Sequence, residues 1–169
     1  MLGQISRIGV IALVGVLLVG TVVSAVSAAP IVEGSQTGGL SHSEIEALGL
    51  ALNDEYKAWA VYDQVIRDLG AILPFTNIVE AEQTHINALV TLFNRYGLQV
   101  PPNKWPGNVP TFNTRPEACA GGVAAEISNV ALYDRLLGAA KHRDIKNVFT
   151  NLRAASLTKH LPAFQRCAP

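Results

Sequence analysis

The sequence predicts an all-α protein whose main domain is a bundle of four helices. Apolar residues recur at spacings of three and four over four stretches, which is the pattern of a helix with one buried face. No stretch alternates between apolar and polar residues for long enough to indicate a sheet. The connections between the four stretches are short, long and short, which is typical of a bundle made of two helical hairpins with a long crossover loop.

Residues 1–29 have the composition of a secretory signal peptide. Arg7 is followed by an apolar run and then by small residues that fit a cleavage site. The alternative is an uncleaved membrane anchor, because residues 8–23 are close to spanning length. We expect a secreted or periplasmic protein without stable membrane association once the signal is cleaved, with a flexible lead over residues 30–40 and one four-helix bundle domain over residues 41–169.

The charge balance argues against nucleic acid as a partner. The chain has 13 Lys and Arg and 13 Asp and Glu, and removal of Arg7 with the signal leaves a net charge of −1. A nearly neutral chain without a basic block lacks the electrostatic attraction that nucleic-acid binding requires.

The four helices are expected over about residues 41–69, 74–97, 123–141 and 144–164. Ser41 and Glu44 form the pattern of a capping box at the first helix. The long loop before the third helix holds five of the nine prolines of the chain. Pro162 is expected to end or kink the fourth helix.

The two halves of the domain resemble each other. The sequence EYKAWAVYD from Glu55 matches EISNVALYD from Glu126, and FTNI at Phe75 matches FTNL at Phe149. Because the two matches occur in the same order, each half is expected to be one helical hairpin of a repeated unit.

Cys119 and Cys167 are expected to form a disulfide. Neither belongs to a CxxC pair or has a histidine at zinc-ligand spacing, and an even number of cysteines in an exported protein indicates a disulfide. A short turn makes the third and fourth helices antiparallel, so that Cys119, before the third, and Cys167, after the fourth, lie at the same end of the hairpin.

Polar residues interrupt the buried stripes of three helices at one level. They are Glu55 in the first helix, Glu82 and His85 in the second, and Glu126 in the third. An unpaired buried carboxylate costs several kcal/mol, so converging carboxylates must share protons, pair with cations or bind metal. A lone buried histidine is more often a hydrogen-bonded core residue, but four such groups at matching depth favour a site for iron, manganese or zinc.

This ligand pattern resembles that of ferritin-like di-iron carboxylate bundles, in which two helices supply one Glu each and two supply Glu-x-x-His. The resemblance covers about residues 41–166, and the YD, NLRAAS and HLPAF motifs with the paired cysteines are similar to the DUF2202 branch. It implies that Glu55 and Glu126 are the single-glutamate ligands and that Glu82 and His85 form one complete pair.

The fourth helix departs from this pattern. An ungapped alignment of the FTN motifs places Ser156 and Lys159 opposite the Glu-x-x-His pair, whereas one inserted residue makes His160 the equivalent histidine and puts Leu157 in place of the glutamate. Either way the second bridging carboxylate is missing. The candidate metal ligands are Glu55, Glu82, His85, Glu126 and His160. Five ligands can hold one ion well, and two only with water or another oxygen as a bridge, so we expect one metal per chain rather than two.

The resemblance and the residues together predict an exported ferritin-like protein that binds iron or a similar divalent metal, with redox chemistry with oxygen or peroxide as a possible activity. The alternative is a non-catalytic structural or binding bundle with a degenerate metal site. Whether the protein is an enzyme is left open. The expected partner is the metal ion, and a homodimer is the expected assembly.

Overall fold

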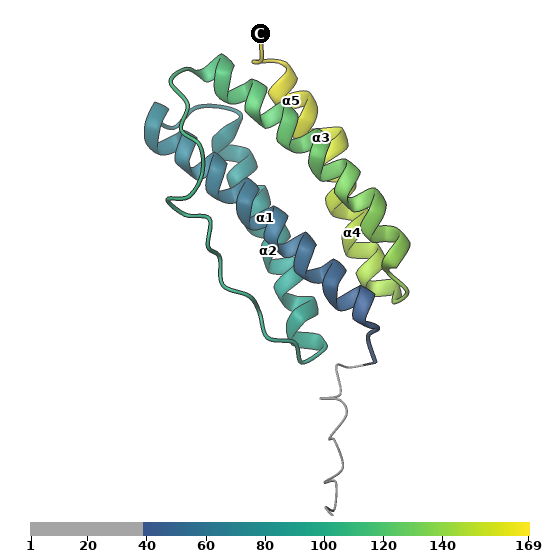
Figure 1. The fold of residues 1–169 in the computed structure, drawn as a ribbon. Coiled ribbons are helices and arrows are strands. Elements are labelled where there is room, and N and C mark those ends of the chain that lie inside the picture. Colours follow the sequence, from purple (N-terminus) through teal and green to yellow (C-terminus); the bar gives the residue numbers. More distant parts are fainter. Residues whose placement is uncertain (1–38) are drawn as a thin grey trace, which may run out of the picture. The chain divides into compact units, whose positions relative to one another are not determined.

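The computed structural model describes residues 39–169, which form an all-helical domain. The predicted signal peptide and nearly all of the predicted lead lie outside the described residues. The helical elements are α1 (His42–Leu69), α2 (Phe75–Arg95), α3 (Arg115–Ala139), α4 (Arg143–Ala155), η1 (Ser156–His160) and α5 (Leu161–Gln165) (Figure 1). No strand occurs in the described part, which confirms the all-α class. None of the described helices is long and apolar enough to cross a membrane.

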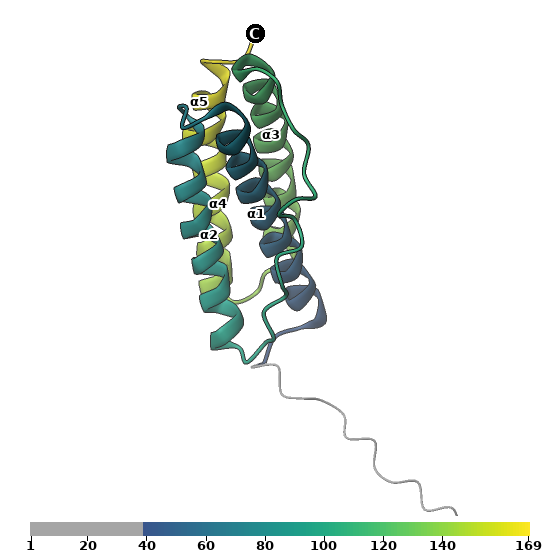
Figure 2. The same ribbon diagram turned by 90° about the vertical axis from the view of Figure 1, so that its left-hand side faces the viewer.

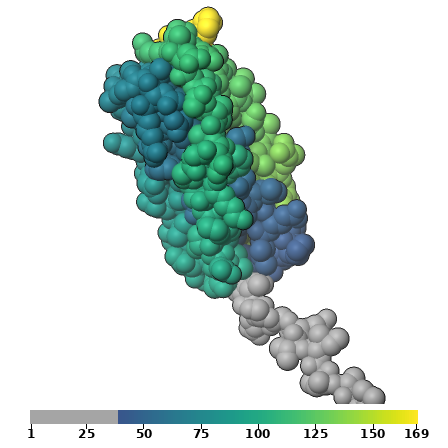
Figure 3. Space-filling view, turned by 60° about the vertical axis from the view of Figure 1, so that its left-hand side comes forward, coloured from purple at the N-terminus to yellow at the C-terminus, as the bar shows by residue number. Residues whose placement is uncertain are grey.

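Two helical hairpins pack side by side (Figures 1 and 2). One is made of α1 and α2, and the other of α3 and the continuous segment α4–η1–α5. The backbone stays helical at Ser156 and Leu161, so the last three elements form one helix with a π-helical turn in its middle. Pro162 is predicted to end or kink this helix. It does not end the helix, because it lies in the first turn of α5 and the helix continues. Residues 96–114 run along the outside of the hairpins from α2 to α3 (Figure 3).

The predicted capping box begins α1, and its glutamate has a second function. The Ser41 side chain accepts a hydrogen bond from the Glu44 N–H, and the Ser41 N–H donates to Glu44 Oε2. Glu44 Oε1 also accepts hydrogen bonds from the backbone N–H groups of Lys141 and His142, at 2.8 and 3.0 Å. Burial raises the pKa of Glu44, but these bonds and that of the His142 side chain outweigh it and hold the pKa well below its ordinary value. Glu44 therefore fastens the start of α1 to the α3–α4 connection.

The third helix begins at Arg115, earlier than the predicted start near residue 123. Thr114 accepts a hydrogen bond from the Glu117 N–H and caps the helix. Pro116 lies in the first turn, where its missing N–H leaves no helical bond unmade. The prolines and glycines of this stretch are typical of a loop, but Pro116 starts a helix.

The disulfide between Cys119 and Cys167 is present, as predicted, with an S–S distance of 2.04 Å. It joins the first turns of α3 to the segment that follows α5. The end of the chain is thereby fixed to the start of the second hairpin.

Gly122 in α3 allows a close approach of Phe164. A Cβ atom at Gly122 would lie 2.7 Å from the ring of Phe164, which is fully buried against Tyr62 and Phe75. We therefore expect Gly122→Ala to lower the free energy of unfolding by about 1–3 kcal/mol, measured by denaturant titration. The matched control is Gly138→Ala in the same helix, where a Cβ would meet nothing within 4 Å. The control should leave stability unchanged or raise it by up to about 1 kcal/mol.

Two apolar clusters fill the interior of the hairpins. One is built around Leu52, Leu89 and Phe149, and the other around Tyr62, Phe75 and Phe164. Along each helix, the buried polar residues identified in the sequence lie between these two clusters. The candidate site is therefore a polar layer with apolar core on both sides.

Candidate metal centre

The structure brings the five predicted ligand residues together from four helical segments. The residues are Glu55 in α1, Glu82 and His85 in α2, Glu126 in α3 and His160 in η1. The three glutamates and His160 are all at most 4 % exposed, and the His85 side chain is 12 % exposed. The helical stripes that identified these residues therefore do converge on one buried layer.

Glu82 belongs to two groups of three potential ligands. One group is Glu55, Glu82 and His85, and the other is Glu82, Glu126 and His160. In each group the donor atoms lie within 4.8 Å of one another. Glu82 Oε2 lies 2.9 Å from Nδ1 of His85, and Glu82 Oε1 lies 3.1 Å from Nδ1 of His160. Each oxygen of one carboxylate thus serves a different group.

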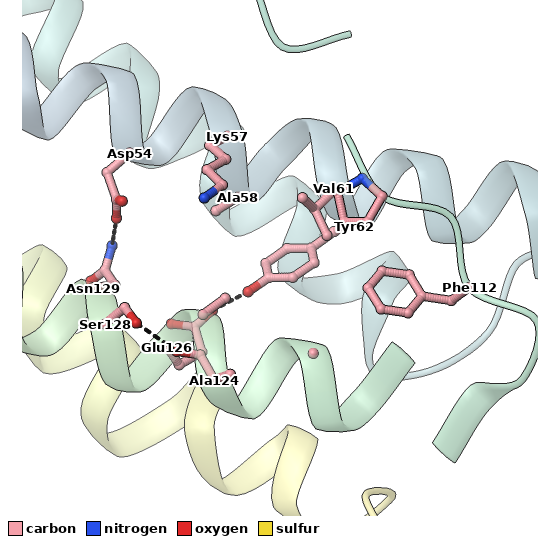
Figure 4. Close-up of a pocket in the computed structure, with 13 residues that line it drawn as sticks. Asp54, Lys57, Ala58, Val61, Tyr62, Phe112, Ala124, Glu126, Ser128 and Asn129 are labelled. Carbon is pink, nitrogen blue, oxygen red and sulfur yellow. Dashed lines mark hydrogen bonds between the residues drawn. The ribbon is translucent and has the colours of Figure 1, made fainter. Parts of the chain in front are cut away.

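Two buried tyrosines orient the other glutamates. The Tyr62 hydroxyl donates to Glu126 Oε1 at 2.6 Å (Figure 4), and the Tyr133 hydroxyl donates to Glu55 Oε1 at 2.7 Å. Both rings are fully buried in the core. In both cases the second carboxylate oxygen faces a histidine: Glu55 Oε2 lies 3.1 Å from His85 Nδ1, and Glu126 Oε2 lies 3.6 Å from His160 Nδ1.

The π-helical turn η1 brings His160 into the layer. A π-helical turn accommodates one extra residue in a helix. In this protein the π-helical turn spans Ser156–His160. Ser156 is buried and Leu157 is 39 % exposed. Of the two residues that the sequence offers in place of the missing glutamate, Ser156 therefore occupies the inward position and Leu157 does not. Lys159, the alternative to His160 in the ungapped alignment, is exposed.

Asn129 and Asp54 complete the polar layer and were not identified from the sequence. Asn129 is 5 % exposed, accepts a hydrogen bond from the Ser156 hydroxyl at 2.8 Å and donates to Asp54 Oδ2 at 2.8 Å and to Glu55 Oε1 at 3.3 Å. Burial raises the pKa of Asp54 to about 6, although the bond from Asn129 opposes this. Asn129 lies one turn after Glu126, so extending the stripe by one position would have found it.

A cavity of about 370 Å³ reaches this layer between α1, α3 and the segment that connects the hairpins (Figure 4). Tyr62, Glu126 and Asn129 line its inner part, and Val61 and Phe112 contribute apolar wall. A small molecule in this cavity would therefore contact Glu126 directly.

Burial and mutual contacts set the charges of the layer. Burial raises the pKa of Glu55 to about 7, although its bond to His85 opposes this. Burial also disfavours protonated histidine, but Glu55 and Glu82 outweigh it and raise the pKa of His85 to about 10. The contacts of His160 with Glu126 and Glu82 likewise raise its pKa to about 9. Conversely, the two histidines hold the pKa of Glu82 below its ordinary value despite its burial. Without metal, both imidazoles are therefore cations at neutral pH.

These pKa values predict that the metal-free protein loses stability at alkaline pH. His85 and His160 have raised folded-state values, so their contribution is complete below about pH 6.5 and is lost as the pH rises toward 9–10. The raised pKa of Glu55 acts in the same direction up to about pH 7. We expect the Tm of metal-depleted protein, measured by calorimetry with chelator present, to fall between pH 6.5 and 9.5. A Tm that stays constant or rises over this range would contradict the protonation described here.

Comparisons with known proteins find one family and one solved structure that are similar to this chain. No curated protein matches the sequence. The solved structure of the hypothetical protein MJ0754 from Methanococcus jannaschii DSM 2661 is similar, with 25 % identity and a TM-score of 0.66, over 75 % of this chain and 80 % of that one. The family described as "Uncharacterized protein domain (DUF2202)" matches residues 44–109. This match covers α1, α2 and part of the connecting segment, and over that part of the chain it agrees with the predicted resemblance to DUF2202.

Proposed function

We propose that the chain is an exported ferritin-like protein that binds iron or a similar divalent metal inside its bundle. The observation that carries the proposal is the pair of Glu, Glu and His groups that share Glu82. The state of His160 supports it. Its Nδ1 is buried and makes no hydrogen bond, although it forms a close ion-pair contact with Glu82 Oε1 at 3.1 Å. A buried polar atom without a partner is costly, and coordination of a metal would satisfy it.

The donor set fits the proposed metals. Glu55 and His85 would hold one ion and Glu126 and His160 a second, with Glu82 shared. Carboxylate oxygens with imidazole nitrogens suit iron and manganese, and also zinc. Bound iron would supply redox chemistry with oxygen or peroxide. The hydrogen bonds from the two buried tyrosines would keep Glu55 and Glu126 in the orientation that ligation needs.

Metal titration of untagged, metal-depleted protein tests the proposal. The sequence favours one ion per chain, but the two groups sharing Glu82 favour two, with water completing the bridge. We expect calorimetric titration with ferrous ion under anaerobic conditions to give two ions per chain. The affinity should rise with pH, because both histidines must lose a proton to bind. A result of one ion per chain would agree with the count predicted from the sequence. A result of no bound ion would refute metal binding.

A second candidate is a non-catalytic bundle with a degenerate site. Ser156 and Asn129 favour it, because a hydroxyl and an amide occupy the place where the repeat predicts a second bridging carboxylate. Oxygen and peroxide consumption by the iron-loaded protein separates the two candidates. Consumption no faster than that of free ferrous ion, with tight binding, would favour the non-catalytic bundle.

Export and assembly belong to the same proposal. The Cys119–Cys167 disulfide supports export, since disulfides persist in oxidising compartments. We propose a secreted or periplasmic protein that is free of the membrane after signal cleavage, forms a homodimer and does not bind nucleic acid. Fractionation of cells expressing the full chain tests the first part, and size-exclusion chromatography with light scattering tests the second.

A further inference from the structure

A second cavity, of about 450 Å³, is lined by the start of α2, the start of α3 and the helix η1–α5. Three basic side chains from separate parts of the chain line it: Arg115, Lys159 and Arg166. None of its lining residues is acidic, and one of them is His160 of the polar layer. This cavity is therefore positively charged, whereas the cavity on the α1–α3 side contains Asp54 and Glu126.

The three cations of this cavity are not neutralised by neighbouring carboxylates. Within residues 39–169, none of them forms an ion pair, whereas Arg67, Arg95 and Arg153 each pair with an aspartate. The first turn of α2, at the edge of the cavity, contains no acidic residue that would offset the positive end of this 21-residue helix. Like charges that converge without a counter-ion are unfavourable, and a bound anion would relieve the repulsion.

Local structure brings the segments that carry these charges together. The π-helical turn η1 leaves Lys159 exposed while His160 points inward. Arg166 precedes Cys167, whose disulfide fixes it near the start of α3, where Arg115 lies. Arg115 also donates its Nε hydrogen to the Leu73 carbonyl at 3.0 Å, which anchors its guanidinium at the rim. The three basic residues are exposed, but the disulfide and the helix bring the backbone segments that carry them to one cavity.

We propose that this cavity binds a small oxyanion of the phosphate or carboxylate class beside His160. Guanidinium and ammonium groups donate strong, charge-assisted hydrogen bonds to the oxygens of such anions. Because the same His160 faces Glu82 and Glu126 on its other side, the bound anion lies next to the second group of proposed metal ligands. The binding itself needs no metal, so it can be tested separately from the proposed function.

The test uses metal-depleted full domain and two probes, inorganic phosphate and succinate, in calorimetric titrations with sodium chloride at equal ionic strength as the reference. We expect saturable binding of one anion per chain. The double variant Lys159→Gln, Arg166→Gln should weaken it at least tenfold, and Arg115→Gln should weaken it independently. Saturation by phosphate alone or by succinate alone assigns the class of anion.

The matched control is Arg143→Gln, Lys146→Gln, which removes two exposed cations of α4 that do not line the cavity. It should change the affinity by less than twofold, and circular dichroism should show that all variants fold. Binding no stronger than that of chloride, or an equal loss in the control, would overturn the proposal. Either result would leave ferrous-ion binding, measured on the same proteins, unaffected.

Discussion

Replacement of Glu82 by glutamine is expected to abolish metal binding at both proposed positions. The affinity should fall by more than roughly 100-fold, because loss of a direct ligand should cost more than loss of a residue that only hydrogen-bonds to a ligand. Glu82 is the one residue common to both groups, and its two oxygens face His85 and His160 separately. An amide keeps the size of the side chain but supplies only one oxygen and no charge. Metal content after dialysis and calorimetric titration with ferrous ion measure the effect.

Two further variants make this prediction specific. Glu80→Gln changes an exposed residue of the same helix and should bind metal as the unaltered protein does. Glu55→Gln removes a ligand from only one group, so the stoichiometry should fall to one ion while the group with Glu126 remains. If Glu82→Gln still bound two ions tightly, the shared-carboxylate arrangement would be wrong.

Removal of the disulfide by Cys119→Ser and Cys167→Ser is expected to lower the free energy of unfolding by about 4 kcal/mol in the chain-entropy estimate. The two cysteines are 48 residues apart in the sequence, so the bond closes a long loop in the unfolded chain. In the folded protein it also holds Phe164 against Gly122. Guanidinium unfolding monitored by circular dichroism measures the change.

Reduction of the unaltered protein provides the matching experiment. Dithiothreitol should destabilise it by the same amount as the double substitution and should have no effect on the variant. Two reactive thiols in the unfolded, unreduced protein would show that the bond does not form.

Much of the fold could be predicted because its signals are local or topological. The capping box at Ser41 and the meeting of Cys119 and Cys167 follow from short patterns and from the order of the helices. The start of α3 was predicted too late, because Pro116, Gly121 and Gly122 are typical of a loop. They are tolerated in a helix since Phe112 and Phe164 pack directly on the two glycines, a tertiary contact that the local sequence does not reveal.

The residue types of the candidate site could be predicted from the sequence, but the contacts between its residues could not. Helical periodicity identified the glutamates and His85, since each interrupts an apolar stripe. It left Ser156 and Leu157 as alternatives opposite Glu82, because the π-helical turn changes the period between Ser156 and His160 and no single alignment pairs both residues correctly. Asn129 was missed because an asparagine in a helix is ordinary until its neighbours Ser156 and Asp54 are known.

The reciprocal tyrosine bonds mean that each hairpin supplies the tyrosine that orients a buried glutamate of the other hairpin. Tyr62 of the first hairpin serves Glu126 of the second, and Tyr133 of the second serves Glu55 of the first. Two identical hairpins related by a twofold axis would exchange the same pair of bonds, so in this one respect the two halves interact as the subunits of a symmetric dimer would. Because both halves belong to one chain, each half can differ in sequence from the other. The first half keeps its central carboxylate at Glu82 while the second half carries Ser156, a difference that identical subunits could not acquire without losing both carboxylates.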